Sequence, residues 1–490
     1  MFKIIATIGT IQIFAIFINV IRSKIIAVLL GPEGVGILSI VDQVVQFIAY
    51  LSVISIPFAS VKFLSRSHSE GFEAFRRTYS SLLKALLWLS ISGTIVALCF
   101  IIFRADLLGP EISRYKTFLL LALLGVPTMV LGGFFSNVLA SVQKIKAAAM
   151  MAVITNMSMT IAVYIGISLG GIFGLYSGNI LTGVFITIGI FIYLRKILHL
   201  PFYDRAISVF DELKRSPDIL PFSFMLFITT VVYSLSLLAA RYSVLKYAGE
   251  AEAGLLQAVM AIGLSINLVL NPANGLFLTP IMNRNISKAE KVRTAIEFQK
   301  KLMVVLALVA LPITLFPQWV LILLFSPQFI QASQFVFLFV ISQCVVQLAG
   351  VNQALLIGLD DLKSYAFMTC AGFVSMGIFS WLLVPSYGIL GVAVGSVFSS
   401  LAIFFMTWTR VRLAHGFSTP RSVSLLMGYG LSFMFLIGFI STRWLDSNMK
   451  TIFLKIGVYL FFLMTLFFFL NREEKAFFFG FAGYKLSLDK

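Results

Sequence analysis

Apolar runs of about 20 residues, the length at which a helix crosses the hydrocarbon core of a bilayer, recur along nearly the whole chain. The chain is 59% hydrophobic and only 12% charged, which excludes a soluble domain. We therefore predict an all-α polytopic membrane protein with about fourteen transmembrane helices. The first run is too long for a cleaved signal peptide and is expected to be a span. The expected spans are residues 4–30, 35–61, 82–103, 117–140, 147–169, 173–194, 219–247, 253–278, 302–324, 335–358, 365–385, 389–409, 422–442 and 451–470.

An internal repeat divides these spans into two halves. Residues 171–178 read Gly-Ile-Phe-Gly-Leu-Tyr-Ser-Gly, and residues 388–395, 217 positions later, read Gly-Ile-Leu-Gly-Val-Ala-Val-Gly. Arg22 precedes glycines at 31 and 36, as Arg241 precedes glycines at 249 and 254. Each half has an even number of spans, so the copies keep one orientation and form a parallel repeat. We predict an N-terminal six-helix lobe (1–200), a cytoplasmic linker (201–218), a C-terminal six-helix lobe (219–415), and two additional transmembrane helices with a cytoplasmic tail (416–490).

The basic residues predict the orientation of the spans. They gather in connections on the side of the N-terminus, such as those from Lys62 to Arg77 and from Arg284 to Lys301. By the positive-inside rule, both termini then face the cytoplasm. This placement accounts for most of the net charge of +17, so no nucleic-acid partner is expected.

Three basic residues are predicted inside the membrane. Arg22 and Lys24 lie in the first span, and Arg241 lies at a matching height in the seventh. A central Arg or Lys costs roughly 2.5–3.5 kcal/mol on insertion scales, so such residues mostly face water or a partner. The alternative for Arg22 and Lys24 is that both reach the outer interface. If they face a cavity, it would suit an anionic, phosphorylated substrate.

Polar side chains form stripes near these charges. Helical spacing places Asn19 on the face of Arg22 with Gln12 and Ala15, and places Gln46 on the second span with Ser39 and Gln43. Further stripes contain Asn271, Asn274, Gln257, Asn267, Gln343 and Gln347. We favour an aqueous cavity shared by these stripes. The alternative is that the polar groups join helices to one another.

Asp42 is the only acid placed deep in a span. It is expected either to neutralise Lys24 or Arg22, or to bind H⁺ or Na⁺ as a coupling group. Lys62 is expected either to meet a phosphate at the inner mouth or to anchor its helix. The spacing of the three cysteines indicates no metal site, and no phosphate-binding loop of an ATPase occurs. No cofactor is therefore predicted.

Residues 29–38, Leu-Leu-Gly-Pro-Glu-Gly-Val-Gly-Ile-Leu, resemble the junction of the first two spans in polysaccharide repeat-unit (O-antigen, Wzx-type) flippases. The Arg ahead of this segment, the two Gly-Ile-x-Gly segments and the fourteen-span layout are similar to that family too. The resemblance covers residues 1–470 and implies the multidrug/oligosaccharidyl-lipid/polysaccharide exporter superfamily. It implies a V-shaped pair of lobes that expose a central site alternately to each side.

The resemblance also implies a substrate and its surroundings. The substrate would be an undecaprenyl-pyrophosphate-linked oligosaccharide, flipped from the inner to the outer leaflet of the bacterial cytoplasmic (inner) membrane. The family's cationic cavity would correspond to Arg22, Lys24 and Arg241. A polysaccharide polymerase and a chain-length regulator are possible partners, besides the membrane lipids.

Three alternatives remain open from the sequence. A flippase for lipid II or another lipid-linked glycan would have a similar fold and cavity. A MATE-like drug antiporter would want acidic residues in its first and seventh spans, where this chain has Arg and Lys. A membrane glycan polymerase or ligase would need a sizeable outer loop, and the outer connections here are short. We therefore expect a transporter and not an enzyme.

Overall fold

The computed structural model describes residues 2–468 except 55, 143, 201–208, 210–218, 274–277, 279–281, 283–286, 417–420 and 444–448. The elements in the described part are all helical: α1 (Phe2–Val53), α2 (Ile56–Glu70), α3 (Phe72–Arg104), η1 (Ala105–Leu108), α4 (Pro110–Ser113), α5 (Lys116–Leu123), α6 (Val126–Ser141), α7 (Ile145–Leu198), α9 (Ile219–Ala248), α10 (Glu250–Ala273), α12 (Lys288–Leu315), α13 (Pro317–Leu324), η3 (Pro327–Ala332), α14 (Ser333–Gly358), α15 (Leu362–Tyr387), α16 (Ile389–His415), α17 (Arg421–Arg443) and α18 (Met449–Phe468).

Glycines in a left-handed conformation mark equivalent turns of the two repeats. Gly31 (φ 65°) bends α1, and Gly249 (φ 91°) separates α9 from α10. Gly171 (φ 54°) bends α7, and Gly388 (φ 55°) separates α15 from α16. Glycine adopts positive φ without the steric cost that other residues meet. The repeat predicted from the sequence is thus reproduced in the backbone.

The bend divides α7 into two arms that form a tight hairpin. We call residues 145–169 and 172–198 its first and second arms, and residues 2–30 and 32–53 the first and second arms of α1. A Cβ placed on Gly174 would clash with the carbonyl of Gly166 on the other arm of α7. The corresponding position of the second repeat, Gly391, abuts the backbone of Leu383 in the same way. The glycines of both repeat segments therefore allow close helix packing, as expected.

Ten helical segments in the described part of the chain are long and apolar enough to cross a membrane. Two of them, Phe17–Val53 and Ala147–Leu198, contain the bends at Gly31 and at Gly170–Gly171. The all-α polytopic membrane fold is confirmed. The total of fourteen spans stays a prediction.

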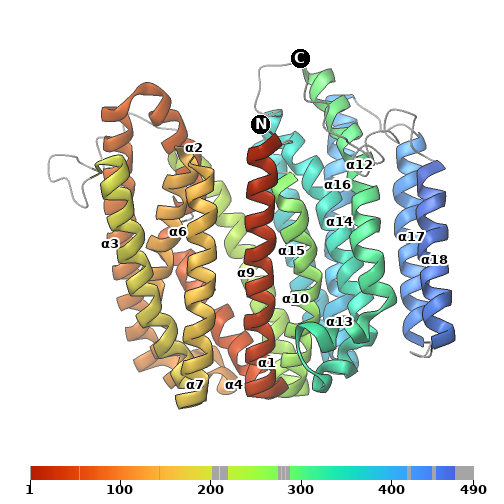
Figure 1. Cartoon of the computed structure of the whole chain (residues 1–490), viewed down its shortest axis with the longest axis horizontal. Helices are drawn as coiled ribbons and strands as arrows, with labels where there is room; N and C mark the ends of the chain where they lie inside the picture. The colour runs from red at the N-terminus through yellow and green to blue at the C-terminus, as the bar shows by residue number, and fades with distance from the viewer. Residues whose placement is uncertain are drawn as a thin grey trace. The chain divides into compact units, whose positions relative to one another are not determined.

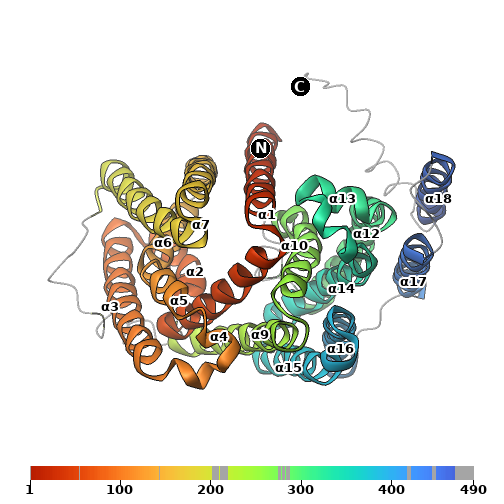
Figure 2. The same ribbon diagram turned by 90° about the horizontal axis from the view of Figure 1, so that it is seen from below.

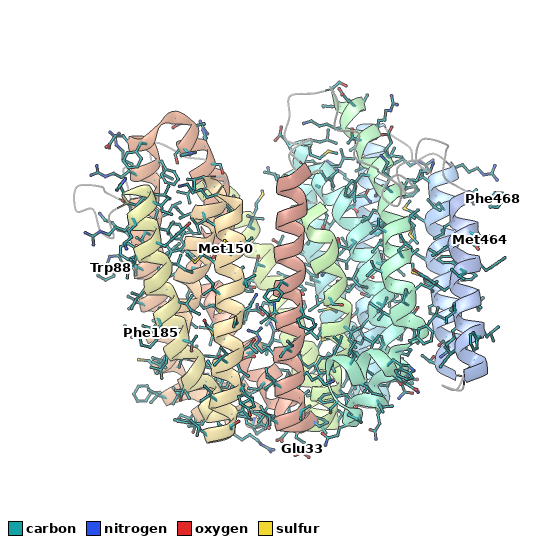
Figure 3. All side chains as sticks on the ribbon, viewed as in Figure 1. Glu33, Trp88, Met150, Phe185, Met464 and Phe468 are labelled. Atoms are coloured by element: carbon teal, nitrogen blue, oxygen red, sulfur yellow. The ribbon has the colours of Figure 1, made fainter. Side chains whose placement is uncertain are left out.

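Large apolar side chains on the outside of these helices fit a lipid environment. Trp88 on α3 is 71% exposed and Phe185 on α7 is 72% exposed, and both point away from their helices in Figure 3. The interior holds aromatic rings instead, with Tyr79 stacked on Phe134 at 5.8 Å between ring centroids. The bilayer solvates the outer rings, and helix packing buries the inner ones.

Contacts divide the chain into two compact units. Unit 1 comprises Met1–Ala258, Leu321–Ile330 and Phe373–Val392, and unit 2 comprises Val259–Val320, Gln331–Gly372 and Ala393–Lys490. In unit 1, α1 packs against α7 and α9, and α6 packs against α2 and α7. In unit 2, α12 packs against α14, α17 and α18. Within each unit the helices run side by side, seen lengthwise in Figure 1 and nearer to end-on in Figure 2.

The predicted lobes, 1–200 and 219–415, and the additional segment 416–490 are defined by the repeat and stay predictions. The predicted linker, 201–218, lies outside the described residues except for position 209.

Candidate functional site

Unit 1 contains a cavity of about 460 Å³. Helices α1, α5, α6 and α7 form its walls. Arg22 reaches it from the first arm of α1, and Asp42 reaches it from the second arm. The cavity therefore places a cation and a carboxylate from two different arms in one space within the membrane-spanning helices.

Tyr176 fixes the carboxylate of Asp42. Its hydroxyl, on the second arm of α7, donates a hydrogen bond of 2.8 Å to Oδ1 of Asp42. Further polar side chains on the wall come from α6 and from both arms of α7: Thr128, Ser136, Thr155, Asn156, Asn179 and Thr187. Several of their hydroxyls donate to backbone carbonyls, as Thr128 does to Gly125 and Ser136 to Gly132. Such hydroxyls remain able to accept hydrogen bonds from a ligand.

Glycines form part of the cavity wall. Gly125, Gly132, Gly133 and Gly183 all line the cavity. A Cβ on Gly133 would have no heavy atom within 4 Å. A side chain added at this position would therefore begin in open space on the cavity wall. The remaining wall is apolar and includes Met129 and Met159.

Arg241 occupies a different environment from Arg22. It is buried, with 9% of its surface exposed, and Nη1 donates a hydrogen bond of 2.6 Å to the carbonyl of Ser39 on the second arm of α1. Its Nε is buried without a hydrogen-bond partner. Arg241 is not among the described residues that line the cavity. Asp42 interacts electrostatically with both Arg241 and Arg22, so two cations surround one carboxylate.

Lys24 points to another part of unit 1. Its side chain is exposed, and Nζ donates a hydrogen bond of 3.3 Å to the carbonyl of Ile322 in the last turn of α13. A cation at a helix C-terminus interacts favourably with the unpaired carbonyls there. Lys24 is not among the described residues of the cavity wall, and of the two predicted partners of Asp42 it is Arg22 that interacts with this acid. In this structure its contact is with a helix end.

The other predicted site residues are not on the described cavity wall. Asn19 is half-buried, and half-buried Gln46 donates a hydrogen bond of 3.0 Å to the hydroxyl of Tyr50, one turn along α1. The side chains of Lys62 and Asn271, and all of Asn274, lie outside the described residues, as do the side chains of Gln12 and Ala15. The binding roles of these residues stay predictions.

Part of the predicted polar stripes joins helices in unit 2. Asn267 on α10 donates a hydrogen bond of 3.1 Å to Oε1 of Gln343 on α14, and Gln347 donates one of 2.6 Å back to Oδ1 of Asn267. Each amide can donate and accept at once, so neighbouring helices satisfy one another's polar groups. At these three residues the structure shows the helix-joining contacts of the alternative, and the cavity shared by the stripes stays a prediction.

Sequence reasoning missed the polar residues of α7 that line the cavity. Tyr176 belongs to the repeated glycine segment, and its counterpart 217 positions later is Ala393. Asn156 and Asn179 interrupt spans that are otherwise apolar. The signal in the sequence was therefore the difference between the two copies. Ala393 shows that a small apolar residue suffices for packing at this position, so the polar Tyr176 indicates another role.

Comparisons with known proteins agree on a family and a fold. The family model described as polysaccharide biosynthesis protein matches residues 2–286, more than half of the chain. No curated protein matches the sequence. Solved structures match over most of their length.

Three of these structures illustrate the likeness. An inward-facing multidrug resistance MATE family transporter of the MOP superfamily has a TM-score of 0.66 and 18% identity, over 84% of this chain and 99% of that one. The lipid II flippase MurJ, in an inward closed conformation, has a TM-score of 0.62 and 16% identity, over 95% and 99%. A MOP superfamily transporter from Pyrococcus furiosus, described as having a binding pocket of reverse polarity, has a TM-score of 0.60 and 18% identity, over 83% and 95%. At these identities the likeness establishes the fold.

Proposed function

Because this chain belongs to the polysaccharide biosynthesis protein family and has the fold of MOP-superfamily transporters, we propose that it flips a lipid-linked glycan across the membrane. The substrate we propose is an undecaprenyl-pyrophosphate-linked oligosaccharide repeat unit, such as an O-antigen unit of lipopolysaccharide. It would move from the inner to the outer leaflet of the bacterial inner membrane, with both termini of the protein in the cytoplasm.

Arg22 on the cavity wall is the observation that carries this proposal. A guanidinium group binds phosphate oxygens through two parallel hydrogen bonds, and it stays charged under all physiological conditions. Arg22 and Arg241 together outnumber the single carboxylate of Asp42, so the surroundings favour an anion. The low dielectric of the helix bundle strengthens this attraction relative to bulk water.

The cavity volume suits a part of such a substrate. Pockets for small ligands are about 300–1,000 Å³, and this cavity of about 460 Å³ falls within that range. We propose that the diphosphate approaches Arg22 and that the polar wall of α7 contacts the adjoining sugar. The polyprenyl tail would remain in lipid. Contacts of further sugars with Asn19, Gln46, Asn271 and Asn274, and of phosphate with Lys24 and Lys62, are extensions of this proposal.

The driving force proposed for the cycle is a cation gradient sensed at Asp42. Its carboxylate lines the same cavity as Arg22 and is held by Tyr176. Binding of H⁺ or Na⁺ there would change the charge that faces the diphosphate, which couples the two ligands electrostatically.

Reconstitution tests the proposed function directly. Purified protein in vesicles would be given fluorescent undecaprenyl-pyrophosphate-linked glycan, and flipping would be followed by protection of the label from an impermeant reductant. We expect flipping by the native protein and a loss of at least about tenfold in the double variant Arg22→Ala/Arg241→Ala. An equal rate in this variant and the native protein would refute the role of the cationic cavity. Export of surface glycan in cells provides the second readout.

The likeness to MurJ favours a second candidate, a flippase for lipid II. The same vesicles would receive labelled lipid II in competition with the oligosaccharide lipid, and the preferred substrate is the one that flips faster. Formation of longer glycan chains in this assay would instead indicate a polymerase. Uptake of a cationic drug with no flipping of either lipid would favour the MATE-like alternative.

A further inference from the structure

Unit 1 contains a cluster of hydrogen bonds and charges that joins the two copies of the repeat. In the first copy, Glu111 lies in the short helix α4 and Tyr115 follows this helix. In the second copy, Tyr242 lies in α9 and Glu250 begins α10. Tyr242 donates a hydrogen bond of 2.8 Å to Oε2 of Glu111. Tyr115 donates a hydrogen bond to Oε1 of Glu250.

A charged pair adds to this crossed arrangement. Nη1 of Arg114 lies 3.7 Å from Oε1 of Glu250. Each side therefore supplies one tyrosine donor and one carboxylate acceptor, and the first copy adds a guanidinium group. We call Glu111, Arg114, Tyr115, Tyr242 and Glu250 the latch. The predicted topology places all five at the outer face of the membrane.

Packing around the latch holds Tyr242 in position. Its ring stacks on that of Trp381, with 6.2 Å between centroids and 13° between planes. Nζ of Lys246 lies 5.8 Å from the centroid of the Trp381 ring, a cation–π distance. The tyrosine is thus oriented toward Glu111 by contacts that do not depend on the hydrogen bond itself.

Direct backbone contact closes the same end of unit 1. A Cβ on Gly36 would clash with the carbonyl of Glu250, and a Cβ on Gly254 would clash with the carbonyl of Pro32. The latch residue Glu250 is therefore in a segment where the backbones of the two copies are in close contact. Latch side chains thus join the α4 region to α9 and α10, and the backbone contact joins α1 to α10.

The latch has the properties of a contact that opens and closes. Tyr115 is buried, with 6% of its surface exposed, so its hydroxyl needs a partner while the contact is closed. Arg114 is 63% exposed and Glu250 31% exposed at the side chain, so water replaces their pairing when the ends separate. Polar contacts at a wet edge can break repeatedly, which a buried apolar contact cannot do as readily.

We propose that the latch is an outer gate, which must open before the glycan lipid can leave toward the outer leaflet. This inference rests on the proposed flippase function. A static contact that only supports folding is the competing explanation, and a covalent lock distinguishes the two.

The first test locks the gate. Arg114→Cys and Glu250→Cys would be introduced into a protein whose three native cysteines are replaced by alanine, and bridged with a short bifunctional thiol reagent that can be cleaved by reduction. We expect bridging to lower flipping at least about tenfold and reduction to restore it. Arg104→Cys and Asp106→Cys form the matched control, because both are exposed and belong to one copy of the repeat. Their bridge should leave flipping unchanged.

The second test weakens the gate and needs no transport. In the cysteine pair, Glu250, the acceptor of Tyr115, is already replaced, so Tyr242→Phe removes the remaining tyrosine hydrogen bond of the latch, to Glu111, and keeps the ring. In the cysteine pair at 114 and 250, we expect the bridging yield to fall severalfold, since the ends are closed for less of the time. Tyr387→Phe, an exposed tyrosine outside the latch, is the control.

The outcomes separate the two proposals. If the cysteine-free parent flips no glycan lipid, the proposed function fails. The bridging yields of the second test then decide whether the latch opens and closes. If the parent flips and the bridged protein flips equally fast, the gate is refuted and the flippase stands. An unchanged bridging yield in the Tyr242→Phe variant would also overturn the gate.

Discussion

Arg22 and Arg241 occupy matching positions in the two copies of the repeat, nine and eight residues before a glycine with positive φ. Their surroundings nevertheless differ. Arg22 is half-buried and lines a cavity, whereas Arg241 is buried and donates to the carbonyl of Ser39. The first arginine is open to a ligand, and the second joins α9 to the other copy of the repeat. Equivalent residues of the two copies thus have a cavity-lining position and a packing position.

The difference shows how a duplicated membrane protein can place one site off its symmetry axis. Both arginines interact with Asp42, yet only the first copy supplies this acid. The residue 217 or 218 positions beyond Asp42 is Val259 or Met260. The carboxylate and Tyr176 therefore both belong to the first copy and lack polar counterparts in the second. Substitutions that act on one arginine and spare the other test this division.

Replacement of Arg22 should have the largest effect. Arg22→Met removes the cation from the cavity wall, so we expect flipping to fall by at least about tenfold while the unfolding temperature stays near that of the native protein. Arg22→Lys should retain part of the activity, because it keeps the charge and loses the paired hydrogen bonds. Vesicle flipping and thermal unfolding in detergent measure the two effects. Native activity in Arg22→Met would refute the substrate-binding role that we propose for Arg22.

Filling the cavity should have a comparable but smaller effect. Gly133→Phe adds a ring in open space next to the wall and leaves both arginines in place. We expect a severalfold loss of flipping from exclusion of substrate. Gly428→Phe on α17 is the matched control, since that glycine also has open space around it and does not line the cavity. Equal activity in the two variants would show that the cavity is not used.

Replacement of Arg241 should affect stability before activity. Arg241→Ala leaves the Ser39 carbonyl without this donor and Asp42 with one cation fewer. Loss of a charged hydrogen bond costs about 1–3 kcal/mol, so the unfolding temperature should fall by several degrees. The drop should exceed that of Arg22→Met. The reverse order of unfolding temperatures would contradict the assignment of Arg241 to packing.

The sequence predicted some parts of this arrangement and could not predict others. Helix-length apolar runs predicted the all-α membrane fold, and the repeated glycines predicted the turns at Gly31 and Gly171, because both depend on local chemistry. The partners of Lys24 and Arg241 are backbone carbonyls, which every residue carries and no pattern distinguishes. The cavity depends on how the hairpin of α7 packs against α6. Such a tertiary contact leaves no periodic pattern in the sequence. Asn267 looked like a cavity residue for the same reason, since spacing shows its face and not its neighbour.

Neutralising Asp42 should alter coupling and spare the binding of the anion. Asp42→Asn keeps the size and the bond from Tyr176 while removing the only carboxylate of the cavity wall among the described residues. We expect flipping to become insensitive to an imposed H⁺ or Na⁺ gradient, with substrate affinity kept or raised. Tyr176→Phe is the companion variant and should retain the dependence on the gradient. A gradient effect that persists in Asp42→Asn would place the coupling site elsewhere.

The smallest effect that we expect is the response of the latch to low pH. Hydrogen bonds from its own backbone and from Tyr242 lower the pKa of Glu111 below its usual 4.5, with the charges of Lys246 and Arg114 acting in the same direction. The closed latch thus favours the ionised form. Its contribution is complete above the usual pKa and is lost as the pH falls through the lowered one.

Exposure limits the size of this response. Spin labels at positions 114 and 250 should report the fraction of molecules in which the two ends are separated. We expect this fraction to grow by less than about twofold between pH 7 and pH 3. Glu111→Gln should show no such change. A shift of equal size in that variant would assign the response to another group.

Gly36 and Gly254 occupy equivalent positions of the two repeats, and each lies against the backbone of the other's helix. Equal residues meeting in this way form the contact that two identical chains make about a two-fold axis. A half-length precursor would already have been self-complementary at this point, so duplication needed no new interface to join its products. Because each glycine packs against the other's helix, a substitution in one half affects the packing of both halves. A methyl group gained by either glycine obstructs both helices, and neither half can drift there alone.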